Sequence, residues 1–244
     1  MDIVTQILHK TPTKLTSKLR GTFLEDLYAT YNFRINHRTI TLPSPIGNID
    51  LVVDSLNRII ANKSHSKFGY EPGLIHLMKS ELSDKTIYFD IGSRFGFYAI
   101  VAQNLGVDPK NIHLFESDST VLEYLKYNVD KSCNLNSTHI GTATDNLSVN
   151  KYVENNSFPT VVKIDVEGAE EDVLKSMNQL LHKKPTLFIE YHPHKLKKDT
   201  DIFEILNDYG YEIKYIDHRV DSDEVCYLDS PHEDSTTLIY AVAL

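Results

Sequence analysis

The chain has 244 residues, 41% of them hydrophobic, which favours one α/β domain (69–244) preceded by an N-terminal extension (1–68). Its formal net charge of −9 argues against a broad nucleic-acid surface, because neutralising phosphates takes clustered Lys and Arg. Its two cysteines are too few for a disulfide framework, which favours a cytoplasmic location. The sequence contains no run of about 18 apolar residues, so no membrane span is predicted.

The N-terminal extension is expected to contain a helix and a hairpin. Apolar residues recur at helical spacing over 13–31, which predicts a helix packed on the main domain; a homodimer contact or a lid over the substrate is the alternative role. Two alternating segments, 39–42 and 48–53, flank a loop with two prolines and a glycine, and they predict a β-hairpin. A short amphipathic helix is expected over 73–82.

From residue 86 onward, strands and helices alternate. We expect strands at 86–90, 112–116, 138–140, 160–165 and 186–190, and helices at 95–105, 119–132, 169–181 and 200–208. This alternation predicts a mostly parallel sheet with right-handed crossovers. Two last strands, 211–216 and 236–244, have no helix between them and predict an antiparallel hairpin that closes the edge.

The turn after the strand 86–90 has the composition of a ligand-binding segment. Asp90 ends the strand, and Gly92 and Gly96 bound a turn that opens a helix, which allows close backbone approach to a ligand. Glu116 ends the next strand, where an acid can bind ribose hydroxyls. The turn lacks the patterns of a P-loop and of a dinucleotide site. Together these residues indicate a cofactor that contains adenosine.

Four acids are expected to meet at one edge of the sheet, because ligands in such sheets bind beyond the carboxyl ends of the strands. They are Asp90, Glu116, Asp165 and Glu190. Any one of them could be a helix cap or a turn former. All four at predicted strand ends are better explained by function.

Residues 162–170, Val-Lys-Ile-Asp-Val-Glu-Gly-Ala-Glu, resemble the most recognisable block of the FkbM family of S-adenosylmethionine-dependent methyltransferases. Three more segments agree in order and spacing, at 69–72, 89–98 and 188–193. The resemblance covers about residues 44–216. It implies a class I, Rossmann-like methyltransferase fold with a seven-stranded sheet, S-adenosylmethionine as cofactor, and methylation of hydroxyls on sugars or natural products.

The resemblance also implies cofactor contacts, at Asp90, Gly92, Gly96, Glu116, Thr142 and Ala143. Neighbouring candidates in or beside the same segments are Tyr70, Glu71, Ser93, Arg94, Tyr98, Ser117 and Asp165. Two of these depart from the family pattern, since Asn is common at the position of Arg94 and Pro at that of Ser117. Arg94 either grips the cofactor carboxylate or points to solvent, and Ser117 is expected to cap the helix 119–132.

Transfer of a methyl group to an alcohol requires a positioned acceptor oxygen and removal of its proton. The candidate catalytic residues are Asp165, Glu190 and His192, one of which would act as general base. A hard-cation site on the same three residues is the weaker alternative, because one imidazole among oxygens does not compel a metal. Lys195, Lys197 and Lys198 follow; they form either a solvated run or a grip on an anionic acceptor.

The predicted function is therefore an S-adenosylmethionine-dependent O-methyltransferase that acts on a glycan or another small hydroxylated acceptor, with no nucleic-acid partner. One alternative is an RNA or protein methyltransferase on the same fold. The acidic balance and the absence of an Asn-Pro-Pro-Tyr motif after the strand 160–165 count against amino-group methylation. A non-catalytic cofactor-binding module is the alternative of another class.

Overall fold

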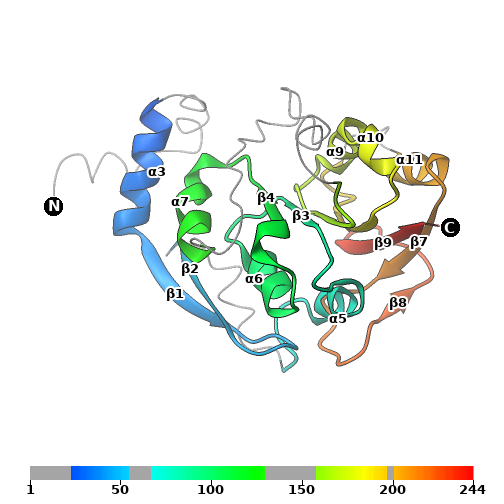
Figure 1. The fold of residues 1–244 in the computed structure, drawn as a ribbon, viewed down its shortest axis with the longest axis horizontal. Coiled ribbons are helices and arrows are strands. Elements are labelled where there is room, and N and C mark those ends of the chain that lie inside the picture. Colours follow the sequence, from blue (N-terminus) through cyan, green and yellow to red (C-terminus); the bar gives the residue numbers. More distant parts are fainter. Residues whose placement is uncertain (1–22, 55–66, 130–157, 197–200, 244) are drawn as a thin grey trace.

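The computed structural model describes residues 23–54, 67–129, 158–196 and 201–243. Its main body is a seven-stranded sheet with helices on both faces (Figure 1). Along the sheet the strands follow the order β4 (Ile112–Phe115), β3 (Tyr88–Ile91), β5 (Val161–Ile164), β6 (Thr186–Tyr191), β9 (Thr237–Ala243), β7 (Tyr211–Ile216) and β8 (Tyr227–Leu228). The expected strand at 138–140 lies outside the described residues.

The first four strands of this order are parallel, as expected, and β9 is antiparallel to both of its neighbours. The predicted antiparallel pair of β7 and β9 is confirmed, with β9 between β6 and β7 and the two-residue β8 beyond β7. The burial pattern explains this order. β9 is buried over its first five residues and requires a neighbour on each side, whereas β7 is partly exposed. The short β8, which the sequence did not predict, forms the edge.

Two apolar clusters cover the two faces of the sheet. One lies beneath α5 (Pro72–Glu81), α6 (Phe97–Asn104) and α7 (Ser119–Asn128). The other lies beneath α9 (Glu170–Ser176), α10 (Asn178–Leu181) and α11 (Ile202–Asp208). Side chains alternate between them, since Tyr88 belongs to the first cluster and Phe89 to the second. A short 3₁₀-helix (Pro109–Asn111) precedes β4.

The single helix predicted over 169–181 is broken in the structure. Met177 has φ −102° and ψ 19°, outside the helical range, and it separates α9 from α10. Asn178 follows the break, and asparagine favours helix starts over helix interiors. The break lies beyond the end of α9, away from Asp165 at the end of β5.

The N-terminal part contains α3 (Phe23–Ile35) and a two-stranded antiparallel sheet of β1 (His37–Leu42) and β2 (Ile49–Asp54). The expected packing of the helix is confirmed for its described part, because α3 packs on α7 and the rings of Phe33 and Tyr124 lie 5.0 Å apart. Residues 13–22 of the predicted helix lie outside the described residues. The hairpin is also confirmed, and its Leu42 and Leu51 join the apolar cluster beneath α5, α6 and α7.

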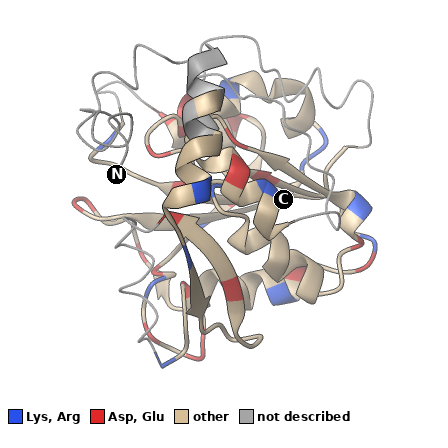
Figure 2. Cartoon of the chain, turned by 90° about the vertical axis from the view of Figure 1, so that its left-hand side faces the viewer, with Lys and Arg blue, Asp and Glu red and all other residues tan. Residues whose placement is uncertain are grey.

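The side of the molecule that carries α3 shows Lys and Arg interspersed with Asp and Glu (Figure 2). None of the described helices combines the length and the apolar composition that crossing a membrane requires.

Candidate active site

The carboxyl ends of the parallel strands meet at one edge of the sheet. In the strand register, Ile91 of β3 lies beside Phe115 of β4 and Ile164 of β5, and Ile164 lies beside Ile189 of β6. Glu116, Asp165 and Glu190 come directly after those last three residues and therefore lie along the same edge. Asp90 is one residue further inside its strand and is completely buried.

The glycine turn after β3 is packed against the chain that leaves β5. Gly92 has φ +87°, and a Cβ atom there would lie 1.8 Å from the carbonyl oxygen of Asp165. The amides of Gly92 and Ser93 both donate to the carbonyl oxygen of Phe115, at 2.8 and 3.1 Å. Only glycine fits at position 92, which leaves the backbone of the turn open to a ligand.

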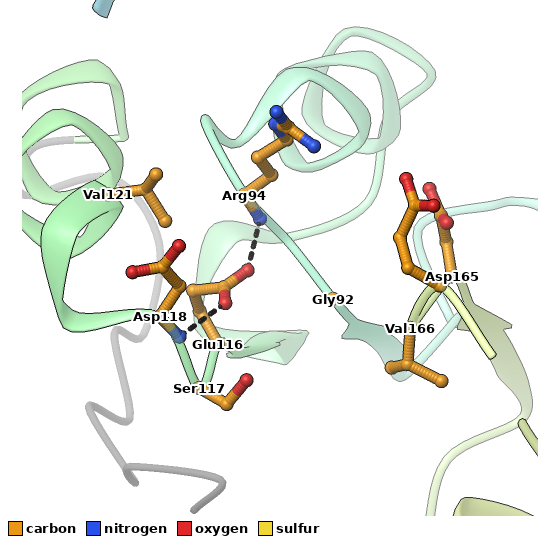
Figure 3. Close-up of a pocket in the computed structure, with 9 residues that line it drawn as sticks. Gly92, Arg94, Glu116, Ser117, Asp118, Val121, Asp165 and Val166 are labelled. Carbon is orange, nitrogen blue, oxygen red and sulfur yellow. Dashed lines mark hydrogen bonds between the residues drawn. The ribbon is translucent and has the colours of Figure 1, made fainter. Parts of the chain in front are cut away.

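A cavity of about 300 Å³ opens beside this turn, between the ends of β3, β4 and β5 (Figure 3). It is lined by Gly92, Arg94, Glu116, Ser117, Asp118, Val121, Asp165, Val166 and Glu167. Glu116 lies between Arg94 and Asp118, with Asp165 and Val166 on the opposite wall (Figure 3). This volume is at the lower end of the range of small-molecule and cofactor sites, about 300–1,000 Å³.

The carboxylate of Glu116 is fixed by two backbone amides. Its Oε2 accepts from the amide of Arg94 at 2.8 Å, and its Oε1 accepts from that of Asp118 at 2.7 Å. Burial raises the pKa of Glu116, and these two hydrogen bonds only partly offset that effect. Each carboxylate oxygen can accept a further hydrogen bond, so Glu116 can still bind ribose hydroxyls.

A smaller cavity of about 50 Å³ shares Gly92, Arg94 and Asp165 with the larger one. Of the predicted cofactor residues, those that line one cavity or both are Tyr70, Gly92, Ser93, Arg94, Tyr98, Glu116, Ser117 and Asp165. Asp90, Glu71 and Gly96 line neither, and Thr142 and Ala143 lie outside the described residues. The predicted cap of α7 is corrected, because Asp118, rather than Ser117, accepts from the amide of Thr120.

Lys163 is a buried cation that the sequence analysis did not single out. Its Nζ lies 3.6 Å from Oδ1 of Asp90 and 3.4 Å from Oδ2 of Asp165, and 4.6 Å from the centre of the Tyr98 ring. Burial lowers the pKa of Lys163, but the charges of Asp165 and Asp90 outweigh it and leave the pKa raised. The sequence signal that could have marked Lys163 is the presence of a charged residue within the apolar strand β5.

The three predicted catalytic residues come together at the ends of β5 and β6. One donor atom from each of Asp165, Glu190 and His192 lies within 4.8 Å of the other two. Burial opposes ionisation of Asp165, but Lys163 holds the pKa of Asp165 below its ordinary value. Burial, together with the charge of Glu71, raises the pKa of Glu190. The two neighbouring carboxyl groups thus differ in proton affinity.

Comparison with protein families gives the family of this chain. The family described as the methyltransferase FkbM domain matches residues 45–213, which is more than half of the sequence. The chain belongs to the FkbM methyltransferase family. It is a methyltransferase, and S-adenosylmethionine is its cofactor. Three features of the site fit that cofactor. They are the close-packed turn at Gly92, the cavity beside it, and the carboxylate of Glu116 in the cavity wall.

Solved structures show the same fold. The putative methyltransferase yhhF from Escherichia coli matches with a TM-score of 0.51 and 9% identity, over 85% of this chain and 99% of that chain. The T. Thermophilus 16S rRNA methyltransferase RsmC, in complex with AdoMet and guanosine, matches with a TM-score of 0.50 and 11% identity. That match covers 86% of this chain and 51% of that one. A comparison with curated proteins finds no significant match.

Two further residues reach the FkbM site from the loop after β7. Nε2 of His218 lies 3.5 Å from Oε1 of Glu190, and the guanidinium of Arg219 contacts the same oxygen. Nε of Arg219 lies 3.4 Å from Oε1 of Glu71, a residue that also accepts a hydrogen bond from the hydroxyl of Tyr98. Nothing in the sequence marked this loop, because it follows β7 at a distance from the family motifs.

These cations bear on the metal alternative. Lys163 is paired with Asp165, and Arg219 contacts Glu190, so both acidic residues of the candidate metal set already have positive partners. A divalent cation at the same oxygens would lie next to these like charges, which is unfavourable. These pairings weigh against a divalent cation at Asp165, Glu190 and His192.

The lysines proposed to grip an anionic acceptor are only partly described. Lys195 forms an ion pair with Glu167, on the wall of the larger cavity. Lys197 and Lys198 lie outside the described residues. Lys195 thus has an acidic partner within the chain.

Proposed function

We propose that this FkbM methyltransferase transfers the methyl group of S-adenosylmethionine to a hydroxyl of a sugar, a glycan or a similar small hydroxylated acceptor. The observation that carries the proposal is the cluster of Asp165, Glu190 and His192, of which Asp165 lines the cofactor cavity. An alcohol is a poor nucleophile until its proton is removed. A cluster of proton acceptors next to the methyl donor is what that chemistry needs.

The bound cofactor supplies an electrophilic methyl carbon on a sulfonium. Glu116 binds the ribose, and the turn at Gly92 allows the backbone to approach the cofactor closely. Asp165, which lines both cavities, borders the acceptor position and orients the hydroxyl. Positioning of this kind is worth on the order of 7–11 kcal/mol, and a placed base contributes roughly 100- to 10,000-fold in rate.

Two rival functions share this fold. RsmC acts on 16S rRNA, but identity of 11% extends only the fold to this chain. The net charge of −9 and the residues Asp165-Val166-Glu167-Gly168 after β5 favour a hydroxyl acceptor over a nucleic-acid or protein amine. The second rival, a cofactor-binding module without turnover, is disfavoured by the cluster of proton acceptors, which reaches the cavity wall at Asp165.

The deciding experiment is a screen with a radiolabelled methyl donor. Pools of nucleotide sugars and oligosaccharides, total RNA, and proteins are each incubated with the enzyme and with its Asp165→Asn variant. We expect label in the carbohydrate pools with the parent enzyme, and little or none with the variant. Label confined to RNA or protein would replace the proposal by its first rival. Cofactor binding without label in any pool would replace it by the second.

A further inference from the structure

A buried carboxylate lies directly behind the histidine of the site. Nδ1 of His192 lies 2.8 Å from Oε1 of Glu170. The side chain of Glu170 is completely buried, and that of His192 is nearly so. Glu170 begins α9, and His192 follows β6, so the contact joins two elements that flank the carboxyl edge of the sheet.

The hydrogen bonds around Glu170 assign the tautomer of His192. Oε1 of Glu170 also accepts from the amide of Gly168, at 3.0 Å. An ionised carboxylate can only accept hydrogen bonds, so Nδ1 of His192 is the donor. The other ring nitrogen, Nε2, then carries the lone pair.

That lone pair faces the site. Nε2 lies 3.7 Å from Oε2 of Glu167 and 4.0 Å from Oε1 of Glu190. Glu167, the nearer of these two groups, lines the larger cavity together with Asp165. The charged and titratable groups around the ring are Asp165, Glu167, Glu170, Glu190, His194 and Lys195, the last paired with Glu167.

The other two candidates for the base are held by cations. Oδ2 of Asp165 lies 3.4 Å from Nζ of Lys163, and Oε1 of Glu190 is in contact with Arg219. Lys163 keeps the pKa of Asp165 below its ordinary value, whereas burial and the charge of Glu71 raise that of Glu190, whose Oε1 is occupied by the guanidinium of Arg219. His192 has the opposite arrangement, because a carboxylate lies behind it and favours the protonated ring.

We propose that Glu170 and His192 form a carboxylate–histidine dyad, in which Glu170 is a positioning residue and Nε2 of His192 is the general base. This inference rests on the proposed function. As the acceptor oxygen forms its bond to the methyl carbon, its O–H bond breaks and the proton moves to Nε2. The carbon–sulfur bond breaks with its electron pair remaining on sulfur. The imidazolium that results is stabilised by the carboxylate of Glu170.

The dyad is tested first without any acceptor. The protein is labelled with ¹⁵N-histidine, and the His192 signals are assigned by their loss in His192→Gln. We expect the Nδ1–H tautomer in the parent at high pH. Glu170→Gln should lower the pKa of His192 and weaken the tautomer preference. Glu171→Gln is the matched control: it makes the same change one residue along the first turn of α9, where the side chain pairs with Lys175 instead.

An Nε2–H tautomer in the parent would overturn the dyad, and so would equal titration of His192 in the parent and in Glu170→Gln. The first measurement needs no variant, so it stands even if Glu170→Gln folds poorly. The second arm uses an acceptor identified in the screen. Glu170→Gln should lower kcat at least 10-fold with little change in the KM of the cofactor, and move the acidic limb of the pH–rate profile to lower pH. Glu171→Gln should match the parent.

The two arms separate failure of the dyad from failure of the proposed function. Methyl transfer with equal kcat and equal pH profiles in the parent and in Glu170→Gln would reject the dyad and leave O-methylation standing. An Nδ1–H tautomer in a protein that methylates no hydroxyl would reject the proposed function and, with it, the role of His192 as base.

Discussion

Gly92 and Asp165 approach so closely that their backbones leave no space for a side chain between them. A Cβ atom at Gly92 would lie 1.8 Å from the carbonyl oxygen of Asp165. The contact joins the turn after β3 to the chain leaving β5, and both segments line the two cavities of the site. The wall of the cofactor site therefore depends on the absence of a single methyl group.

Gly92→Ala should destabilise the protein and abolish cofactor binding. The left-handed backbone alone costs a non-glycine residue roughly 1–2 kcal/mol, and the clash adds about 1–3 kcal/mol. Gly106→Ala is the matched control, because Gly106 has φ +99° but no atom within 4 Å of its Cβ position. Urea unfolding and calorimetry with S-adenosylhomocysteine give the two readouts. Equal losses of stability in the two variants would show that the clash is relieved at no cost.

Lys163→Met should cost about 3–5 kcal/mol of unfolding free energy, because removing one partner of a buried ion pair leaves charge uncompensated. Here Asp90 and Asp165 would both lose their cation. The control is Lys175→Met, which breaks an exposed pair with Glu171 and should cost far less. Urea unfolding curves of the two variants provide the comparison. Similar small losses would mean that water replaces Lys163 beside Asp90.

Glu116→Gln should weaken cofactor binding by roughly 1.5–3 kcal/mol, the scale of a hydrogen bond to a charged group. The amide side chain can accept from only one of the two backbone amides that the carboxylate now binds, and it loses one acceptor for the ribose. Glu123→Gln on α7, where Glu123 pairs with Lys126, controls for the change in charge. The dissociation constant is measured by calorimetry. A value for Glu116→Gln equal to that of the control would remove Glu116 from the ribose site.

Stability should depend on pH through His192. Burial lowers the pKa of His192, but the hydrogen bond with Glu170 and the surrounding carboxylates outweigh it and leave the pKa raised. The folded state therefore binds this proton more tightly than the unfolded state, whose histidine titrates near about 6.5. The added stability is fully present below that pH and is lost as the pH rises through the raised value.

The measurement is the free energy of unfolding at several pH values above and below neutrality, for the parent and for His192→Gln. The parent should lose stability more steeply than the variant as the pH rises, by up to about 1.4 kcal/mol for each unit of the pKa shift. His182→Gln changes an exposed histidine and should follow the parent. Parallel curves for the parent and His192→Gln would contradict the prediction.

The sequence predicted the fold well because its signals are local. Apolar runs that end in an acid locate β3, β4, β5 and β6, and the strand register then brings those ends together. The failures are also physical. The break at Met177 was missed because the apolar pattern continues through α10. The place of β9 was not predicted, because it depends on which of the two last strands is buried enough to need a neighbour on each side.

The candidate site was predicted less completely. Asp165, Glu190 and His192 were found because parallel strands deliver their carboxyl ends to one edge. His218 and Arg219 were missed, because the loop that holds them reaches the edge through tertiary packing. Lys163 was overlooked although a charged residue inside a buried strand is itself a signal. Glu170 was not singled out, because its contact with His192 arises only when α9 and the end of β6 pack together.

The position of β9 between β6 and β7 sets an order of assembly for the catalytic edge. β7 joins the rest of the sheet through β9, which is the last strand in the described part of the chain. During synthesis, β6 with Glu190 emerges well before its second neighbour exists. Until β9 is added, the loop with His218 and Arg219 has no sheet to carry it to Glu190. The ion pair of Arg219 and Glu190 thus depends on β9, the strand that ties β7 to the parallel strands.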